Sequence, residues 1–297
     1  MSTTGAHVQI SLCWHLMKES RPIVLTLAAL RFTAGALVAT EAPLKLDVVA
    51  AGLSWILVTA GVYLTNASSD VVSDTINHKR RPLAQGQIST RQVNVAAICT
   101  FAGALLIGSF FGPAFLVVLA SMGTLGVLYS IGPRPGKNHF FSAGLIVALG
   151  IFLPYAGGSL AAHGEIRPPA LIGGLVCGAW AAMASVSKDF ADLAGDKADG
   201  RVTLPVLLGL RNASQVAAGG STLIALLALG CTLIPGLKGL WVLWLGTCAF
   251  AAVCGMSRKQ NSRFSLGTPY RIFMMTQLST NGALITMATA ALTIPTP

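Results

Sequence analysis

Charged residues are scarce in this sequence. Asp, Glu, Lys and Arg together make up 10% of its 297 residues, against roughly 25% in a typical soluble domain. Acidic residues are the scarcest, with ten against twenty Lys and Arg, whereas 54% of the chain is hydrophobic. Because so little charge cannot cover a water-facing surface, the composition excludes an ordinary soluble domain and predicts a protein embedded in lipid.

Several functional motifs are also missing. The sequence contains no Gly-rich Walker or dinucleotide-binding loop, and its five histidines show no zinc-type spacing. The six cysteines fall mostly within apolar segments and have no paired spacing, which favours buried small residues over disulfides or metal ligands. The net charge of +10 does not indicate a nucleic-acid partner, because the basic residues lie at the ends of apolar segments and not on a soluble, groove-reading domain.

Long apolar segments recur from one end of the chain to the other. A helix of about 20 apolar residues crosses the hydrocarbon core of a bilayer. We predict an all-α integral membrane protein of about nine transmembrane helices, with residues 1–297 forming one domain, because the polar stretches are too short for a core of their own. The predicted spans are 22–41, 48–68, 92–111, 113–131, 140–161, 169–187, 215–234, 238–255 and 272–293.

The basic residues indicate how these spans are oriented. Nine spans place the polar connections alternately on two sides, and sixteen of the twenty Lys and Arg fall on the side that holds the N-terminus. The other side holds Lys45, Arg167 and Lys238. Because cytoplasmic loops carry the excess of basic residues, we predict a cytoplasmic N-terminus and a C-terminus on the opposite side. The first apolar run continues into a spanning helix, so we expect no cleavable signal peptide.

Six of the ten acidic residues fall in two polar stretches, each following a predicted span. In the first stretch, Asn66, Asp70 and Asp74 are spaced four residues apart, which places them in one stripe on a helix. In the second stretch, Asp192 and Asp196 repeat this spacing. Both stretches continue through basic residues to a proline, an outline that hints at an internal duplication.

Acidic side chains this close together repel one another and are costly at a membrane boundary. One interpretation is a solvated acidic cap that nearby arginines neutralise. We favour another, in which carboxylates from two helices face each other and hold Mg²⁺, an ion that prefers oxygen ligands and commonly shares them with substrate phosphates. Basic side chains on the same side are then candidates to bind the phosphate oxygens, namely Arg80, Arg81, Lys137, Lys188 and Arg201.

Paired carboxylates together with basic side chains suit a diphosphate that acts as a leaving group better than one that serves to bind a nucleotide. Apolar helices below the charged residues are suited to a long hydrocarbon, so the sequence predicts an allylic diphosphate as substrate. A transporter is disfavoured, because the charges gather at one face and do not run through the middle of the membrane.

Four motifs in order along the chain resemble those of the UbiA-type intramembrane prenyltransferase superfamily, and the resemblance covers nearly the whole chain. The matching residues are Ser20-Arg21-Pro22; Asn66, Asp70, Asp74 and Asn77 with the continuation from Arg81 to Ser89; Tyr129-Ser130 with Pro133 and Lys137; and Lys188-Asp189-Phe190 with Asp192, Gly195-Asp196, Gly200, Thr203-Leu204-Pro205-Val206 and Gly209.

The resemblance implies a helical bundle around a central cavity, closed by cytoplasmic cap loops. It implies that the four aspartates Asp70, Asp74, Asp192 and Asp196 are catalytic and bind Mg²⁺ together with Asn66. The diphosphate-binding residues are then Asn66, Arg81, Tyr129, Lys137, Lys188 and Arg201. Most members transfer the allylic cation to an aromatic or other lipophilic acceptor, and a smaller group cyclises it without an acceptor.

Two positions depart from the pattern of the superfamily. Ala67 and Ala194 stand where many members have Asp and Glu. These departures point away from the quinone, chlorophyll and haem branches. They leave two readings, a specialised transferase and a terpene cyclase.

A few other residues suggest a function in the membrane interior. Arg31 interrupts the first apolar span, and an intramembrane charge is a functional hypothesis by default. In a functional role, it pairs with an acid in the cavity or faces the carboxylate of an acceptor. In a structural role, its side chain extends to the membrane surface or donates to a backbone carbonyl. For the tryptophans, packing at the lipid interface is favoured over offering π-faces to a carbocation; these are Trp55, Trp180, Trp241 and Trp244.

Overall fold

The computed structural model describes residues 3–38, 45–257 and 265–293. This part of the chain is helical, apart from turns and one isolated bridge between His139 and Val202. Its α-helices are α1 (Thr3–Glu19), α2 (Pro22–Leu37), α3 (Leu46–Ser69), α4 (Val71–Ile76), α5 (Thr90–Gly108), α6 (Pro113–Ser130), α7 (Phe140–His163), α8 (Pro168–Lys188), α9 (Leu193–Ala198), α10 (Leu204–Cys231), α11 (Trp241–Ser257) and α12 (Thr268–Thr293). Short 3₁₀ turns are η1 (Ser109–Phe111), η2 (Gly136–Asn138) and η3 (Lys238–Leu240).

The predicted spans can be compared with these helices one by one. Each predicted span falls on one long helix of the described chain, namely α2, α3, α5, α6, α7, α8, α10, α11 or α12. Among the described residues, seven helices are long and apolar enough to cross a membrane. The other two are α2 and α12. α2 is apolar but has 16 residues, and its predicted end at residue 41 lies outside the described residues. The all-α membrane architecture is confirmed, whereas the count of nine is not.

The predicted start of the seventh span, at residue 215, is wrong. α10 begins at Leu204 and contains a left-handed residue, Gly209 (φ 73°), which kinks it. Arg211 and Asn212 are helical but exposed. A prediction from hydropathy starts the span after these polar residues. The helix can begin before them because their side chains are exposed and need not be buried in the bundle.

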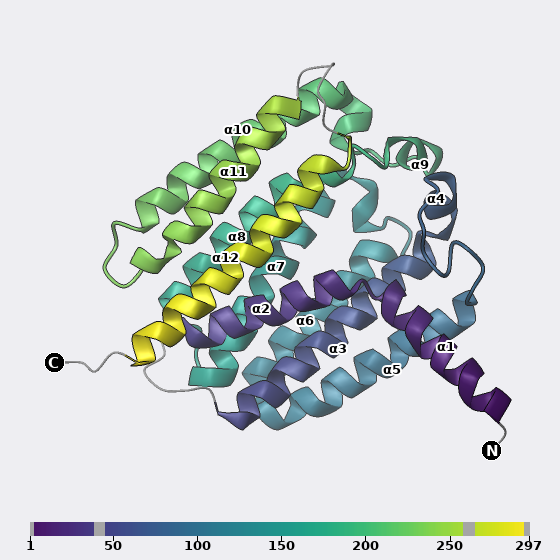
Figure 1. The fold of residues 1–297 in the computed structure, drawn as a ribbon, viewed down its shortest axis with the longest axis horizontal. Coiled ribbons are helices and arrows are strands. Elements are labelled where there is room, and N and C mark those ends of the chain that lie inside the picture. Colours follow the sequence, from purple (N-terminus) through teal and green to yellow (C-terminus); the bar gives the residue numbers. More distant parts are fainter. Residues whose placement is uncertain (1–2, 39–44, 258–264, 294–297) are drawn as a thin grey trace.

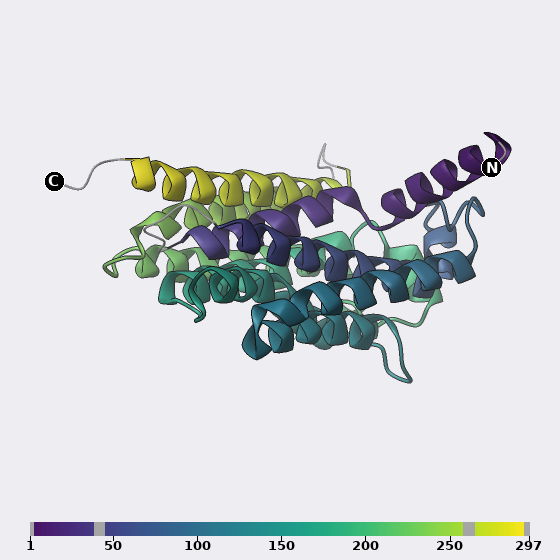
Figure 2. The same cartoon turned by 90° about the horizontal axis from the view of Figure 1, so that it is seen from below.

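The long helices lie side by side in a flattened bundle (Figures 1 and 2). In its interior α7 contacts α2, α6 and α8, and α12 contacts α2, α8 and α11. The short helices α4 and α9 contact each other at one end of the bundle, next to the ends of α3 and α8 (Figure 1). The chain therefore brings the two Asp-containing stretches together at one end.

Glycines allow α2 and α7 to approach each other closely. A Cβ atom on Gly35 would lie 2.2 Å from the Tyr155 carbonyl oxygen, and one on Gly158 would lie 2.0 Å from the Phe32 carbonyl oxygen. Small residues at such crossings let helix backbones touch, as in many membrane proteins. The relative position of α2 and α7 is therefore fixed by backbone contact.

We expect Gly158→Ala to lower the free energy of unfolding by about 1–3 kcal/mol, because the new methyl group overpacks against rigid backbone. Gly144→Ala in the same helix is the matched control, since its Cβ would meet its nearest atom, Ala182 Cβ, at 3.9 Å. Both variants gain the same helix propensity. Thermal unfolding in detergent measures the difference, and equal melting temperatures for the two variants would contradict the expectation.

Candidate active site

The same backbone turn follows α3 and α8. Asp70 has φ −102° and ψ 4°, and Asp192 has φ −103° and ψ 3°. Each precedes a six-residue helix, α4 or α9, and a residue with positive φ follows that helix, His78 in one case and Gly200 in the other. The two stretches that share a spacing in the sequence therefore share a conformation, with two aspartates at the start of each short helix.

The predicted single helical stripe of Asn66, Asp70 and Asp74 is wrong. α3 ends at Ser69, and Asp74 belongs to α4. Serine hydroxyls compete for the carbonyls at this point: Ser69 Oγ donates to the Asn66 carbonyl oxygen at 2.9 Å, and Ser73 Oγ donates to that of Asp70 at 3.1 Å. The same two carbonyls still accept backbone N–H groups, from Asp70 at 3.0 Å and from Asp74 at 2.8 Å. The break lies at Asp70 itself, so Asn66 and Asp74 belong to separate helices.

Asp70 is the most heavily paired acid of the site. Its Oδ1 accepts hydrogen bonds from Lys137 Nζ at 2.8 Å and Arg201 Nη2 at 2.7 Å, and its Oδ2 accepts one from Asn66 Nδ2 at 2.7 Å. Burial by itself raises the pKa of Asp70, but the Lys137 ammonium, followed by the Arg201 guanidinium, outweighs it and holds this pKa well below its usual range. Asp70 is therefore an ionised carboxylate with two cations in contact.

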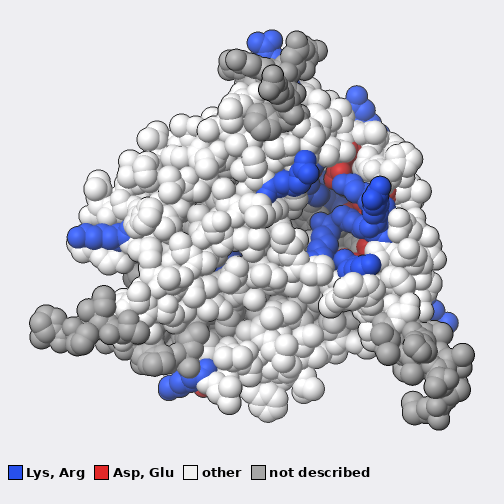
Figure 3. All heavy atoms as spheres, viewed as in Figure 1, with Lys and Arg blue, Asp and Glu red and all other residues white. Residues whose placement is uncertain are grey.

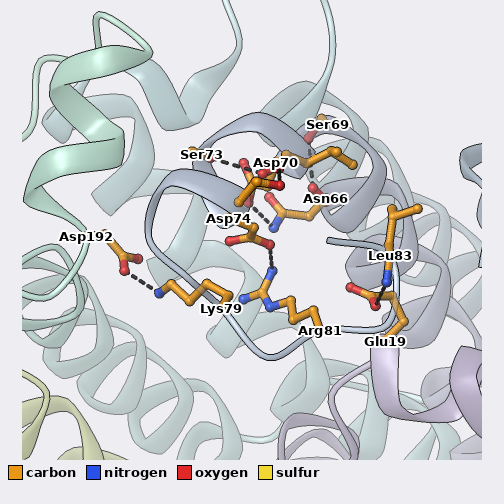
Figure 4. A network of polar contacts seen from close by, with 12 residues as sticks. Glu19, Asn66, Ser69, Asp70, Ser73, Asp74, Lys79, Arg81, Leu83 and Asp192 are labelled. Carbon is orange, nitrogen blue, oxygen red and sulfur yellow. Dashed lines mark hydrogen bonds and ion pairs between the residues drawn. The ribbon is translucent and has the colours of Figure 1, made fainter. Parts of the chain in front are cut away.

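Ion pairs cross between the two stretches in a reciprocal way, and Figure 4 shows the one that joins Lys79 to Asp192. Arg201 of the second stretch binds Asp70 of the first, and Lys79 of the first stretch binds Asp192 of the second. Lys79 and Arg201 each lie nine residues after the aspartate that opens their own stretch. A further ion pair within the first stretch joins Arg81 to Asp74. The crossed pairs hold α4 and α9 together at the end of the bundle.

Asn77 adds a neutral link between the stretches. Its Oδ1 accepts a hydrogen bond from the Gly195 backbone N–H at 3.0 Å, and its Nδ2 lies 3.5 Å from the Asp192 carbonyl oxygen. A Cβ atom on Gly195 would lie 2.3 Å from Asn77 Nδ2. A larger residue at position 195 would therefore displace the Asn77 side chain and break its hydrogen bond to the Gly195 N–H.

Asp196 is the least satisfied acid of the site. Its Oδ1 accepts a hydrogen bond from Arg201 Nη1 at 3.4 Å, and its Oδ2 is buried without a hydrogen-bond partner among the described residues. Burial raises the pKa of Asp196, opposed by the charge of Arg201. An orphaned carboxylate oxygen next to the cavity described below is a free ligand position.

The carboxylates do not converge into a ready-made metal cluster. Among the described residues, no three His, Cys, Asp or Glu side chains are placed to hold a metal ion together. The predicted metal set of Asn66, Asp70, Asp74, Asp192 and Asp196 is instead neutralised by basic side chains. Its chemistry still fits Mg²⁺, because all its donors are carboxylate or amide oxygens and the Asp196 Oδ2 position is open.

A cavity extends from this charged end between the helices. Its apolar walls include Leu27, Trp55, Met122, Ile151 and Phe273. Six residues predicted for the site line its charged end, namely Asn66, Tyr129, Lys137, Lys188, Asp196 and Arg201. Figure 3 shows the basic and acidic side chains gathered in a recess on one face of the molecule, and most of the rest of that face is uncharged. The cavity therefore combines a charged mouth with a hydrocarbon-lined interior.

The remaining predicted residues lie around this mouth. Asp70, Asp74, Asp192 and Arg81 are not part of the cavity wall but form the ion pairs beside it. Arg80, a further candidate for phosphate, makes no ion pair with any described residue.

Three residues of this end were not predicted as site residues. Lys79 was counted only as a basic loop residue, although its offset from Asp70 equals that of Arg201 from Asp192. Asp189 also lines the cavity, where burial raises its pKa to about 7. Glu19 is buried and its Oε2 accepts a hydrogen bond from the Leu83 backbone N–H at 3.1 Å, which ties α1 to the loop after α4 (Figure 4).

The lipid-interface prediction for the tryptophans is wrong for two of them. Trp55 and Trp180 are fully buried, and Trp55 lines the cavity. Their small or aromatic neighbours in adjacent helices explain this, since the Trp55 ring packs against Phe32 and Phe115 and the Trp180 ring against Phe273. Trp241, by contrast, is exposed.

The fold and the site together define a helical membrane protein whose apolar cavity opens at a mouth built from paired carboxylates and cations. Comparison with known proteins identifies it more closely. The chain belongs to the UbiA prenyltransferase family, whose sequence profile matches residues 28–280.

Individual relatives agree with this assignment. The chain is 31% identical over 213 residues to a digeranylgeranylglyceryl phosphate synthase from Halobacterium salinarum, with 69% of each chain covered. It is also 31% identical over 218 residues to the enzyme of that name from Haloquadratum walsbyi, with 72% of each covered. Its fold is similar to that of a UbiA homologue from Archaeoglobus fulgidus bound to GPP and Mg²⁺, with a TM-score of 0.74, 19% identity, and coverage of 94% of this chain and 100% of that chain.

Proposed function

We propose that this protein is a Mg²⁺-dependent prenyltransferase that ionises an allylic prenyl diphosphate and transfers the prenyl group to a lipophilic acceptor. The observation that carries the proposal is the charged mouth, with Lys137, Lys188, Asp196 and Arg201 at one end of a cavity whose walls are mostly apolar. A diphosphate matches the mouth and an isoprenoid chain matches the walls. The A. fulgidus homologue with GPP and Mg²⁺ supports the same substrate class and metal.

The residues that would hold Mg²⁺ are Asn66, Asp70, Asp74, Asp192 and Asp196. When bound, the metal neutralises charge on the departing diphosphate. The basic side chains that now contact these carboxylates then become available for phosphate oxygens, to which charge-assisted hydrogen bonds are strong. Three of these side chains would exchange a carboxylate partner for a phosphate oxygen, namely Arg81, Lys137 and Arg201. Lys188 and Tyr129 would bind the phosphate oxygens directly from the cavity wall.

The transfer itself balances without a redox partner. The bond between C1 of the prenyl group and the bridging oxygen breaks, and its electron pair leaves with the diphosphate. A nucleophilic carbon or oxygen of the acceptor forms the new bond to C1, and its proton passes to water or to the released diphosphate. The protein contributes a fixed site for the leaving group and a cavity that keeps water from the allylic cation.

Transfer is favoured over cyclisation by the relatives. They are named for making a glyceryl phosphate that bears two geranylgeranyl groups, which is a transfer product with a lipid acceptor. A terpene cyclase is the second candidate, because Trp55, Tyr63 and Phe273 line the cavity and aromatic faces stabilise cations.

Incubation with prenyl diphosphates separates the two candidates. Purified protein with Mg²⁺ is given geranyl, farnesyl or geranylgeranyl diphosphate, first alone and then with a lipophilic acceptor. We expect fast diphosphate release and a prenylated product only when the acceptor is present. Release of a hydrocarbon or a cyclic alcohol without any acceptor would establish the cyclase instead.

We further propose that the site faces the cytoplasm. α3 and α8 both end at the charged mouth, and the basic residues Lys45, Arg167 and Lys238, assigned to the other side, lie at the opposite ends of α3 and α8 and before α11. This arrangement agrees with the excess of basic residues expected in cytoplasmic loops. Prenyl diphosphates are then taken from the cytoplasm, and their chains lie within the bilayer.

A further inference from the structure

Arg31 lies deep in the cavity wall. α2 begins at Pro22, close in sequence to Glu19, which binds the loop after α4 at the charged end. Arg31 lies nine residues after Pro22, or about 14 Å along an α-helix. Its side chain is buried, with 3% of its surface exposed, and it belongs to the wall of the cavity. Among the described residues no carboxylate forms an ion pair with it. A buried guanidinium without a counter-charge is costly inside a membrane.

The hydrogen-bond network around Arg31 has too few acceptors. Gln277 Oε1 accepts from Arg31 Nε at 3.3 Å and from Arg31 Nη2 at 3.0 Å. The same oxygen also lies 3.2 Å from the donor Cys177 Sγ and 3.4 Å from the donor Asn281 Nδ2. Asn281 Nδ2 has a closer acceptor in the Gln277 backbone carbonyl oxygen, at 2.8 Å. The other three donors still exceed the two lone pairs of one carbonyl oxygen.

The neighbouring groups do not supply the missing acceptors. Asn281 Oδ1 accepts a hydrogen bond from the Tyr155 hydroxyl and none from the side chains of Arg31 or Gln277. Gln277 Nε2 is buried and finds no acceptor in the described chain, and Arg31 Nη1 makes no hydrogen bond to a described residue. The network therefore has donors and positive charge to spare, which an anionic oxygen group would satisfy.

The position of the guanidinium is set by rigid helices. The backbones of α2 and α7 touch through Gly35 and Gly158. Gln277, the hydrogen-bond partner of Arg31, comes from α12, and Cys177, which contacts Gln277, comes from α8; both helices contact α2. A side chain fixed in this way loses little conformational freedom when a ligand binds, which favours affinity.

We propose that Arg31 binds an anionic group of the prenyl acceptor, a carboxylate or a phosphate monoester, at a subsite of the cavity separate from the diphosphate mouth. Gln277 is a positioning residue that orients the guanidinium through Nε and Nη2, leaving Nη1 for the ligand. The inference rests on the proposed transfer function. A positive group at this depth also disfavours a carbocation that migrates along the chain, which agrees with capture by an acceptor near the mouth.

Matched acidic and neutral acceptors test the subsite. The pairs are 4-hydroxybenzoate with 4-hydroxybenzamide, and geranylgeranylglyceryl phosphate with geranylgeranylglycerol. Equilibrium binding to the purified protein, without Mg²⁺ or prenyl diphosphate, gives the ratio of acid affinity to neutral affinity for each pair. We expect this ratio to be about 30 to 100 in the pair that fits, because one side of a buried charged contact is lost in the neutral compound. The pair that shows the preference distinguishes a carboxylate from a phosphate.

Variants assign the preference to Arg31. We expect Arg31→Gln to bring the ratio to near 1, and Arg31→Lys to restore part of it, because the charge returns without the planar fork. Arg91→Gln, which removes an exposed charge on α5, is the control and keeps the wild-type ratio. Melting temperatures confirm that each variant is folded. The proposal is overturned if the wild type shows no preference in either pair, or if Arg31→Gln keeps it. The diphosphate release of the wild type tests the transfer function separately.

Discussion

Asp192→Asn is expected to reduce diphosphate release from an allylic diphosphate on the order of 10²- to 10³-fold, and Asp70→Asn at least as much. Both substitutions remove an anionic oxygen proposed to hold the Mg²⁺ that neutralises negative charge on the departing diphosphate, and the loss of one electrostatic contribution of this kind typically has this size. Release of diphosphate under saturating Mg²⁺ measures the loss. Asp47→Asn, at the exposed start of α3, is the matched control and is expected to match the wild type.

Stability distinguishes a catalytic loss from a folding defect. Asp70→Asn leaves Lys137, which is 6% exposed, without a carboxylate, whereas Arg201 keeps Asp196 and Asp199 as partners. Unpaired buried charges of this kind cost about 3–5 kcal/mol. Asp192→Asn leaves Lys79, which is 28% exposed and can turn to solvent, so its melting temperature is expected to change little. Retained activity in a folded Asp192→Asn protein would remove this residue from the proposed site.

Removal of divalent metal is expected to abolish diphosphate release without unfolding the protein. Activity depends on a cation that shares carboxylate and phosphate oxygens. Folding does not, because Lys79, Arg81, Lys137 and Arg201 already neutralise the carboxylates. Protein treated with EDTA and dialysed is assayed for diphosphate release and for thermal unfolding, before and after Mg²⁺ is restored.

The two readouts have separate consequences. Activity that persists in the metal-free protein would contradict a role for Mg²⁺. Unfolding of the metal-free protein would contradict the assignment of the ion pairs as substitutes for the metal. Recovery of activity with Mg²⁺, at an unchanged melting temperature, is the result we expect.

Much of the fold could be predicted from the sequence because hydropathy and motif order act locally. The spans of α3 and α8 follow from runs of apolar residues. The turns at Asp70 and Asp192 do not, because a four-residue spacing of polar side chains indicates a continuous helix. The start of α10 could not be predicted in this way, because Arg211 and Asn212 are polar residues on a helix that has already begun. The count of nine spans also depends on α2 and α12. Neither of them is among the seven described helices that are long and apolar enough to cross a membrane.

The structure brings the predicted site residues to one end of the bundle, but their contacts could not be predicted. Asp70 and Arg201 were both predicted, but their ion pair joins residues 131 positions apart and arises only when α4 and α9 pack together. The role of Lys79 was available in the sequence, since the two stretches repeat the same offsets from aspartate to base. Arg31 stood out in the sequence as an intramembrane charge. Its partner Gln277, 246 positions away, could not be identified before the helices were assembled.

The central claim is that the two Asp-containing turns hold metal and diphosphate together. Crystals grown with Mn²⁺ and the unreactive analogue geranyl S-thiolodiphosphate test it most directly, because Mn²⁺ scatters anomalously and marks its own position. We expect anomalous peaks between Asp70 and Asp74 on one side and Asp192 and Asp196 on the other, in contact with the analogue's phosphates. Analogue bound with its diphosphate away from these aspartates, or metal bound elsewhere, would contradict the claim.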